Sequence, residues 1–267
     1  MKPRVAVHKF SSCDGCQLAF INDGKVLLGV TSLVDLVHFA EAGPVDPYAK
    51  VDIAFVEGSV STPHEFEMIK KIRENSDYLV TIGACATSGG LQALRNTANA
   101  EEWFKGVYAH PEYLDNLKTA TPISDHVTVD LELWGCPVSP KQVVTAVRWL
   151  LSGVQPSFPH DSMCLECKRQ GNVCVLVTQG MPCMGPVTKG GCGALCPSFG
   201  RACYSCFGPS ENPNTTSFGN RLEGLGLMPD EVARRFMMIH SNTPEFAKAG
   251  KHFKGIPVVE ESKEGGN

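Results

Sequence analysis

The chain has 267 residues, of which 43% are hydrophobic and 19% charged, enough for one large domain or two ordinary ones with a sizeable core. Its formal net charge of −4 at pH 7, without a long run of like charges, speaks against a nucleic-acid-binding protein. No apolar run approaches the roughly 20 residues of a membrane span and no export signal opens the sequence, so we expect a protein of the reducing cytoplasm.

The first part of the chain alternates between strand and helix patterns. Helix 61–75 is delimited by Thr62 as N-cap, Pro63 at the first position and Glu65 closing a capping box, and helix 139–153 begins with Ser139 as its cap. Alternating strands and helices predict a parallel sheet covered by helices, that is, the α/β class. The predicted strands are the short β-branched or apolar runs 4–10, 51–57, 78–84 and 127–135.

The composition changes near residues 152–162, which are rich in Ser and Pro, and we place a domain boundary between residues 155 and 156. Residues 180–214 are dense in Gly, Pro and Cys, so this segment needs something other than a hydrophobic core to hold it. Residues 229–250 predict one or two short helices with Val232, Phe236 and Ile239 as a core face. We expect the tail 261–267 to be frayed, and the role of the insertion 94–126 stays open.

Twelve cysteines in a reducing compartment favour metal or cluster ligation over disulfides. Four of them follow predicted strands, and the carboxyl ends of parallel strands meet at one edge of a sheet. Four thiolates converging from three loops form the ligand set of an iron–sulfur cluster, and nearby glycines would let backbone N–H groups approach it. These four residues are Cys13, Cys16, Cys85 and Cys136.

Two other interpretations of this set remain open. A thioredoxin-like dithiol also places Cys-x-x-Cys at a strand-to-helix turn, but it leaves Cys85 and Cys136 unexplained. A structural zinc site uses four cysteines too, although its ligands usually come as two tight pairs.

The remaining eight cysteines divide by sequence order into two further sets of four. Spacing alone does not separate zinc from iron here, and either metal would supply the folding energy that a Gly- and Pro-rich segment lacks. Three clusters in one chain would form an electron relay. The two sets are Cys164, Cys167, Cys174 and Cys183, followed by Cys192, Cys196, Cys203 and Cys206.

Four motifs in order, "CDGCQ", "VEGSVS", "GACATSGG" and "WGCP", resemble the small subunit of nickel–iron hydrogenases. The resemblance implies a flavodoxin-like domain over residues 1–155 and an irregular, cysteine-rich iron–sulfur domain over 156–267. It also implies a separate large subunit that holds the nickel–iron centre and cleaves H₂.

The resemblance further assigns the three ligand sets to three 4Fe–4S clusters. The set that begins with Cys13 would hold the proximal cluster, the set that begins with Cys164 the distal cluster, and the set that begins with Cys192 the medial cluster. Family members linked to membranes or the periplasm have a histidine in place of Cys164, and a proline where Cys196 stands. We therefore expect 4Fe–4S rather than 3Fe–4S at the medial position, as in cytoplasmic bidirectional hydrogenases.

Phrases such as "SSCDGCQL", "VDIAFVEGSVST" and "CLEC" are similar to the delta subunit of NADP-linked sulfhydrogenase-type complexes, in which other subunits carry flavin, the NAD(P) site and further clusters. Alternatives within the family are small subunits that feed a heterodisulfide reductase or a deazaflavin. The related quinone-site subunit of respiratory complex I has adjacent cysteines and lacks the eight-cysteine extension. A zinc-stabilised interaction protein without a redox role is the alternative outside the family.

Glu57 follows a predicted strand at the same sheet edge as the cysteines. A carboxylate there could relay protons between the nickel–iron site and solvent if its pKa is raised. The structural alternative is that it caps or pairs within its loop. We expect the face around Cys13, Cys16 and Glu57 to be covered by the partner subunit, so that the chain alone is unstable.

Overall fold

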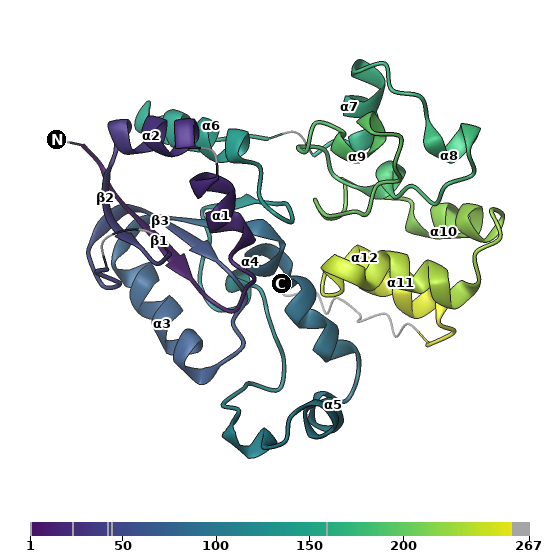
Figure 1. Ribbon diagram of the computed structural model, residues 1–267, viewed down its shortest axis with the longest axis horizontal. Helices are drawn as coiled ribbons and strands as arrows, with labels where there is room; N and C mark the ends of the chain where they lie inside the picture. The colour runs from purple at the N-terminus through teal and green to yellow at the C-terminus, as the bar shows by residue number, and fades with distance from the viewer. Residues whose placement is uncertain (1, 23, 42, 44, 159, 258–267) are drawn as a thin grey trace, which may run out of the picture.

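The computed structural model describes residues 2–22, 24–41, 43, 45–158 and 160–257, so the tail predicted to be frayed lies outside the described residues. The chain forms two lobes that lie side by side (Figure 1). The first lobe contains the sheet, and the second contains only helices and loops within the part described. Within the described residues, no helix is long and apolar enough to cross a membrane.

A five-stranded, fully parallel sheet organises the first lobe. Its strand order, β2-β1-β3-β4-β5, is the order of flavodoxin-type folds, which confirms the predicted class. The order reverses between β1 and β3, so the carboxyl ends of these two strands flank the crevice where such folds bind their ligands. The strands are β1 (Arg4–Lys9), β2 (Asp35–Phe39), β3 (Val51–Glu57), β4 (Ser76–Ile82) and β5 (Leu131–Leu133).

Helices cover both faces of the sheet. On one face, α6 (Pro140–Leu151) buries Val143, Ala146 and Val147 against the strands, next to α1 (Gly15–Ile21) and α2 (Gly24–Leu33). On the other face, α3 (Pro63–Glu74) buries Ile69 and Ile72. These two apolar layers hold the sheet because burial of aliphatic side chains is the main favourable contribution to folding.

The two predicted helices are present, and their caps differ in detail. At the start of α3, Glu65 N–H donates to Thr62 Oγ1 at 3.2 Å and Thr62 N–H donates to the Glu65 carboxylate at 3.0 Å, which confirms the capping box. Ser139 occupies the N-cap of α6, but its side chain makes no capping hydrogen bond, so that part of the prediction was wrong.

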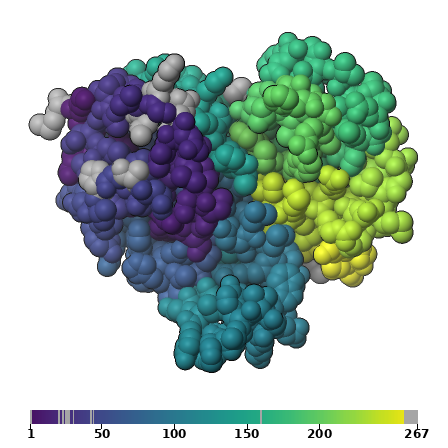
Figure 2. All heavy atoms as spheres, viewed as in Figure 1, coloured from purple at the N-terminus to yellow at the C-terminus, as the bar shows by residue number. Residues whose placement is uncertain are grey.

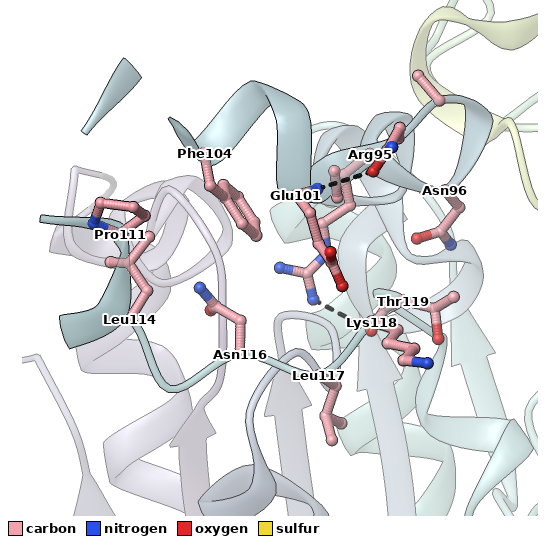
Figure 3. A pocket seen from close by; sticks show the side chains of 13 residues that line it. Arg95, Asn96, Glu101, Phe104, Pro111, Leu114, Asn116, Leu117, Lys118 and Thr119 are labelled. Carbon is pink, nitrogen blue, oxygen red and sulfur yellow. Dashed lines mark hydrogen bonds between the residues drawn. The ribbon is translucent and has the colours of Figure 1, made fainter. Parts of the chain in front are cut away.

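The insertion 94–126 projects from the first lobe at the bottom of the view (Figure 2). It contains the end of the 3₁₀ helix η1 (Gly90–Thr97), α5 (Ala100–Val107) and the short 3₁₀ turns η2 (Pro111–Tyr113) and η3 (Ile123–Asp125). Asn96 joins the two ends of the insertion, since its side chain pairs with both Ala120 N–H and Ala120 C=O. The insertion forms an open pocket of about 400 Å³ that Arg95, Glu101 and Phe104 help to line (Figure 3).

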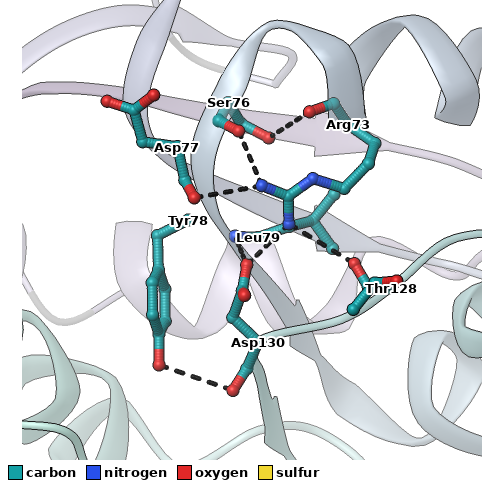
Figure 4. A network of polar contacts seen from close by, with 7 residues as sticks. All are labelled: Arg73, Ser76, Asp77, Tyr78, Leu79, Thr128 and Asp130. Atoms are coloured by element: carbon teal, nitrogen blue, oxygen red, sulfur yellow. Dashed lines mark hydrogen bonds and ion pairs between the residues drawn. The ribbon is translucent and has the colours of Figure 1, made fainter.

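The fourth predicted strand is shorter than expected because its beginning binds an arginine. Arg73 Nη1, from the end of α3, donates to Asp130 Oδ2 at 2.6 Å and to Thr128 C=O at 3.3 Å (Figure 4). The Asp130 carboxylate also accepts from Leu79 N–H of β4 at 2.7 Å. Asp130 N–H also donates to Leu79 C=O at 3.0 Å, and the paired residues of β5 begin at Leu131.

The second lobe is built on a core of aromatic side chains from its last three helices. Phe236 packs against Phe218, Phe246 and Phe253, with ring centroids 5.5–6.4 Å apart. The prediction of helices at 229–250 is confirmed as two helices, while the helix before them was not predicted. The helices are α7 (Met163–Arg169), α8 (Val175–Thr178), α9 (Leu195–Ser198), α10 (Thr215–Glu223), α11 (Pro229–His240) and α12 (Pro244–Phe253), with the 3₁₀ turn η4 (Gly185–Val187) between α8 and α9.

The buried hydrophobic residues of the described chain form three clusters. Two of them come from residues between 5 and 147, and the third comes from residues between 163 and 253. The boundary between residues 155 and 156 itself stays a prediction.

Candidate metal centres

The first cysteine set gathers at the carboxyl edge of the sheet. Cys13 and Cys16 lie in the turn after β1 and in α1, Cys85 lies in α4 (Gly83–Ser88) directly after β4, and Cys136 follows β5. The thiols are near enough to affect one another electrostatically, since Cys16 interacts with Cys85 and Cys136, and Cys13 interacts with the same two. The structure therefore brings together all four residues that the sequence analysis grouped.

Glycines leave the space around these thiols open. A Cβ atom at Gly83 would collide with Cys16 Sγ, and one at Gly90 would lie 2.7 Å from Cys85 Sγ. Both glycines also have positive φ angles, +85° and +57°, which L side chains rarely adopt. Larger residues at these positions would occupy the room next to the sulfur atoms.

The chemistry of the first set fits a positively charged group between the thiols. Burial raises the pKa of Cys16, and the Glu57 carboxylate raises it further. Burial likewise raises the pKa of Cys85 to about 12 and raises that of Cys136, with neighbouring thiols adding to both shifts. Four thiolates gathered in this way would repel one another, so they need a cationic core, and iron–sulfur cores are held in proteins by such sets of four cysteines.

Glu57 lies at the end of β3, among these cysteines, and is only 2% exposed. Its carboxylate accepts hydrogen bonds from the backbone N–H groups of Cys16 at 3.0 Å and Gln17 at 3.1 Å. Glu57 therefore caps α1, for which Asp14 at the N-cap position provides no side-chain hydrogen bond. Burial raises the pKa of Glu57, although the two N–H groups partly oppose that shift by stabilising the charged form.

The second set lies around the ends of α7 and α8. Cys164 interacts electrostatically with Cys183, Cys167 and Cys174, so these four residues are also grouped in space. Burial raises the pKa of Cys164 and Cys167. A Cβ at Gly185 would lie 3.3 Å from Cys164 Sγ and 3.6 Å from Cys183 Sγ.

The third set is supplied by the loop around α9. Cys206 interacts electrostatically with Cys192 and Cys196, and Cys203 interacts with Cys206. Burial raises the pKa of Cys206 to about 12 and also raises that of Cys203. Cys203 N–H donates to Cys183 Sγ at 3.2 Å, so the second and third sets adjoin each other at these two residues.

The third set also adjoins the first. The backbone of Cys136 donates a hydrogen bond to the Cys206 sulfur, and the two thiols interact electrostatically. The three sets therefore follow one another from the sheet edge into the second lobe, with the third set in the middle. Cys13 and Cys174, which belong to the two outer sets, are exposed, whereas Cys183 and Cys203 between them are buried.

No three His, Cys, Asp or Glu side chains among the described residues form a ready-made site for a single metal ion. The thiols nevertheless receive backbone hydrogen bonds of the kind that iron–sulfur ligands accept. Val138 N–H donates to Cys16 Sγ at 3.4 Å, and Ser205 N–H donates to Cys203 Sγ at 3.3 Å.

A buried histidine that the sequence analysis did not identify joins the two lobes near the middle set. His240 Nε2 donates to Cys206 C=O at 3.1 Å, and its Nδ1 accepts from Ser88 Oγ of α4 at 2.7 Å. The ring also packs on Trp134, with centroids 5.4 Å apart. Burial lowers the pKa of His240 to about 4, so the imidazole is neutral at physiological pH and keeps both hydrogen bonds.

Known proteins share this organisation. The family described as "NADH ubiquinone oxidoreductase, 20 Kd subunit" matches residues 13–150. The chain is 33% identical over 232 residues to the sulfhydrogenase 2 subunit delta of Pyrococcus furiosus, in an alignment that covers 87% of this chain and 97% of that protein. It is 31% identical over 265 residues to a vhu subunit of the F420-non-reducing hydrogenase of Methanocaldococcus jannaschii, over 86% of this chain and 92% of the relative.

A solved hydrogenase structure is also similar to this chain. A chain of an NAD+-reducing NiFe-hydrogenase in the H₂-reduced state aligns with a TM-score of 0.54 at 29% identity, over 60% of this chain and 96% of that one. The match with the 20 Kd subunit family covers the sheet lobe, while the two relatives extend over the cysteine-rich lobe as well. The chain therefore belongs to the NADH ubiquinone oxidoreductase 20 Kd subunit family and, within it, is a hydrogenase small subunit.

Proposed function

We propose that this iron–sulfur subunit relays electrons through three 4Fe–4S clusters between a nickel–iron large subunit, where H₂ is cleaved, and a subunit that carries flavin and an NAD(P) site. Family membership supports the coarser role, an electron-transfer subunit of a hydrogenase that works in a hetero-oligomer with a large subunit. The cluster number and the acceptor are the finer parts of the proposal.

The observation that carries this proposal is the continuous succession of the three cysteine sets. Cys13, Cys16, Cys85 and Cys136 would hold the proximal cluster, Cys164, Cys167, Cys174 and Cys183 the distal cluster, and Cys192, Cys196, Cys203 and Cys206 the medial cluster. The contacts of Cys136 with Cys206 and of Cys203 with Cys183 support this order.

A 4Fe–4S cluster, when bound, takes up and releases one electron at a time. The protein contributes thiolates, backbone N–H donors and exclusion of water, which together set the reduction potential. Phe207 contributes to that exclusion, since it is buried beside Gly135 and Gly191, which adjoin Cys136 and Cys192. The exposed thiols Cys13 and Cys174 support entry and exit of electrons at opposite ends of the relay.

The proposed electron acceptor is inferred from proteins that are similar to this chain. One structural neighbour is an NAD+-reducing enzyme, which favours a flavin and NAD(P)-linked partner in the cytoplasm. The relatives named F420-non-reducing hydrogenase support the alternative, in which a chain of this kind feeds a different acceptor such as a heterodisulfide reductase. Co-purification of a flavin-containing subunit and NADP-dependent oxidation of H₂ would distinguish the first acceptor from the second.

Glu57 stays a proposed proton relay in addition to its observed role as a cap. Its position at the sheet edge and the increase of its pKa on burial support this role, because a carboxyl group with a raised pKa exchanges protons more readily near neutral pH.

The test of the proposed function is the iron and acid-labile sulfide content of this subunit in the complex, purified anaerobically. We expect about twelve irons and about twelve sulfides per chain, four of each for every set of four thiolates. Zinc with little sulfide would contradict the electron relay and favour a zinc-stabilised interaction protein. Four to eight irons per chain would contradict the proposed number of three clusters.

A further inference from the structure

Glu166 lies between two cysteines of the distal set but binds the loop of the medial set. It belongs to α7, two residues after Cys164 and directly before Cys167. Its carboxylate accepts three backbone hydrogen bonds, from Gly191 N–H at 2.8 Å, Gly193 N–H at 3.0 Å and Ala194 N–H at 3.3 Å. These donors surround Cys192, so one side chain holds the loop that carries this thiol.

The loop needs such support because its backbone is unusual. Gly191, Gly193 and Ala194 all have positive φ angles, of +131°, +66° and +50°. Ala194 is strained in this conformation, since residues with a Cβ rarely adopt it. The conformation directs several N–H groups to one side, an arrangement that binds anions. The anion here is the Glu166 carboxylate.

The same loop also supports the Cys192 sulfur directly. The backbone N–H groups of Leu195 and Ala194 donate to this sulfur. The Glu166 carboxylate accepts from the N–H groups on both sides of Cys192, so its negative charge lies beside this ligand. A negative charge at this place disfavours an added electron on a cluster bound there.

Gln170, directly after α7, holds the same loop through an uncharged side chain. Gln170 Nε2 donates to Gly193 C=O at 2.8 Å, and Ser198 Oγ of α9 donates to Gln170 Oε1 at 2.9 Å. Gln170 therefore offers a control that loosens the contact between α7 and the loop but leaves the charge in place.

We propose that Glu166 is a positioning residue which orders the loop 190–194 around Cys192 and whose negative charge lowers the reduction potential of the medial cluster. This inference rests on the proposed assignment of Cys192, Cys196, Cys203 and Cys206 to that cluster. Because Glu166 stands on the helix of the distal ligands, it also fixes the two ligand sets relative to each other.

The test is the substitution Glu166→Gln in the assembled complex, with Gln170→Ala and Glu166→Asp as matched variants. The readouts are iron content per chain and the midpoint potential of each cluster, from redox titrations at one fixed pH followed by electron paramagnetic resonance. For Glu166→Gln we expect medial reduction to become about tenfold more favourable, an increase in potential of about 59 mV for one electron. The proximal potential should not change.

The matched variants separate the charge from the packing. Glu166→Asp keeps the charge and should stay near the wild-type medial potential, and Gln170→Ala should do the same. If Glu166→Gln instead loses about four irons while Gln170→Ala keeps them, the result still supports positioning of the ligand loop by Glu166. An unchanged medial potential with full iron content, or an equal shift in Gln170→Ala, would overturn the inference. Absence of clusters from the wild-type protein would overturn the proposed function instead.

Discussion

The Cys16 N–H donates to Glu57 Oε1 at 3.0 Å, which ties the carboxyl end of β3 to the helix that carries a thiol of the first set. This bond joins α1, which follows β1, to the end of β3, and the strand order reverses between these two strands. The ends of β1, β4 and β5 lead to cysteines, whereas the end of β3 supplies a carboxylate in their midst. The structural role of Glu57 and its proposed proton transfer can therefore be tested separately.

Substitution of Glu57 should separate capping from proton transfer. Glu57→Ala leaves the N–H groups of Cys16 and Gln17 buried without an acceptor, which costs about 1–3 kcal/mol for each group, so we expect lower thermal stability and loss of the proximal cluster. Glu57→Gln retains one acceptor oxygen but does not titrate. We expect Glu57→Gln to keep nearly all its iron while H₂ oxidation falls by about tenfold or more, as for loss of a general acid–base group. Full H₂ oxidation by an iron-replete Glu57→Gln complex would show that the residue only caps α1.

Gly83 provides a steric test of the first ligand set. In Gly83→Ala the new Cβ would collide with Cys16 Sγ, so we expect loss of the proximal cluster and a decrease of about four irons per chain. Gly153→Ala is the matched control, because Gly153 also has a positive φ, of +68°, but has open space around it. Both variants carry backbone strain, and only Gly83→Ala blocks the sulfur. Equal iron content in the two variants, measured on the anaerobic complex, would contradict a cluster at this place.

Much of the sheet lobe could be predicted because local signals and tertiary structure agree there. The capping box of Thr62 and Glu65 marks the start of α3, and the burial of Ile69 and Ile72 follows from their spacing along the helix. In contrast, β2 was not predicted, since residues 24–39 are mostly apolar with a few scattered polar residues, and helix and strand are hard to separate in such a stretch. Residues 127–130 have strand character in the sequence, but Thr128 C=O and the Asp130 side chain bind Arg73, and β5 begins at Leu131.

At the candidate site, too, only the residues that leave a local pattern in the sequence could be predicted. The spacing of the cysteines was sufficient to group them, because each of the first four follows a strand and the others lie close together in sequence. Glu166 and His240 gave no such signal. Glu166 meets its loop 25–28 residues farther along the chain, and His240 meets Ser88 across 152 residues. The Glu166 contacts are fixed by packing within the second lobe and the His240 contact by the packing of the two lobes, so neither leaves a local pattern in the sequence.

Cys196 tests the predicted 4Fe–4S state of the medial position. It lies in the first turn of α9, where backbone N–H groups have no partner within the helix, so proline is tolerated there. Cys196→Pro should therefore leave the fold intact, remove one thiolate and give a 3Fe–4S cluster with a raised reduction potential. The measurement is the paramagnetic signal of the oxidised protein, together with a decrease of about one iron per chain. Spectra identical to those of the wild type would rule out Cys196 as a ligand.

A pair of buried histidines on β1 and β2 should make the stability of the sheet lobe depend on pH. The rings of His8 and His38 lie 4.8 Å apart, and burial, followed by repulsion from His38, lowers the pKa of His8 to about 3. Burial also lowers the pKa of His38. Between pH 6.5 and about 3 the unfolded chain therefore binds more protons than the folded chain, so stability falls as the pH falls in this range.

The substitution His8→Leu removes this titration, and the exposed His64→Leu on α3 is the control. As the pH falls from 6.5, the free energy of unfolding of the wild type should decrease by up to about 1.4 kcal/mol per pH unit for each such histidine. His8→Leu should lose one of these contributions, so that its thermal midpoint, measured on the complex from pH 8 to pH 5, falls less steeply than that of the wild type. His64→Leu should follow the wild type. Parallel curves for His8→Leu and the wild type would mean that His8 becomes protonated without unfolding, because the lobe admits water or a counter-charge at the pair.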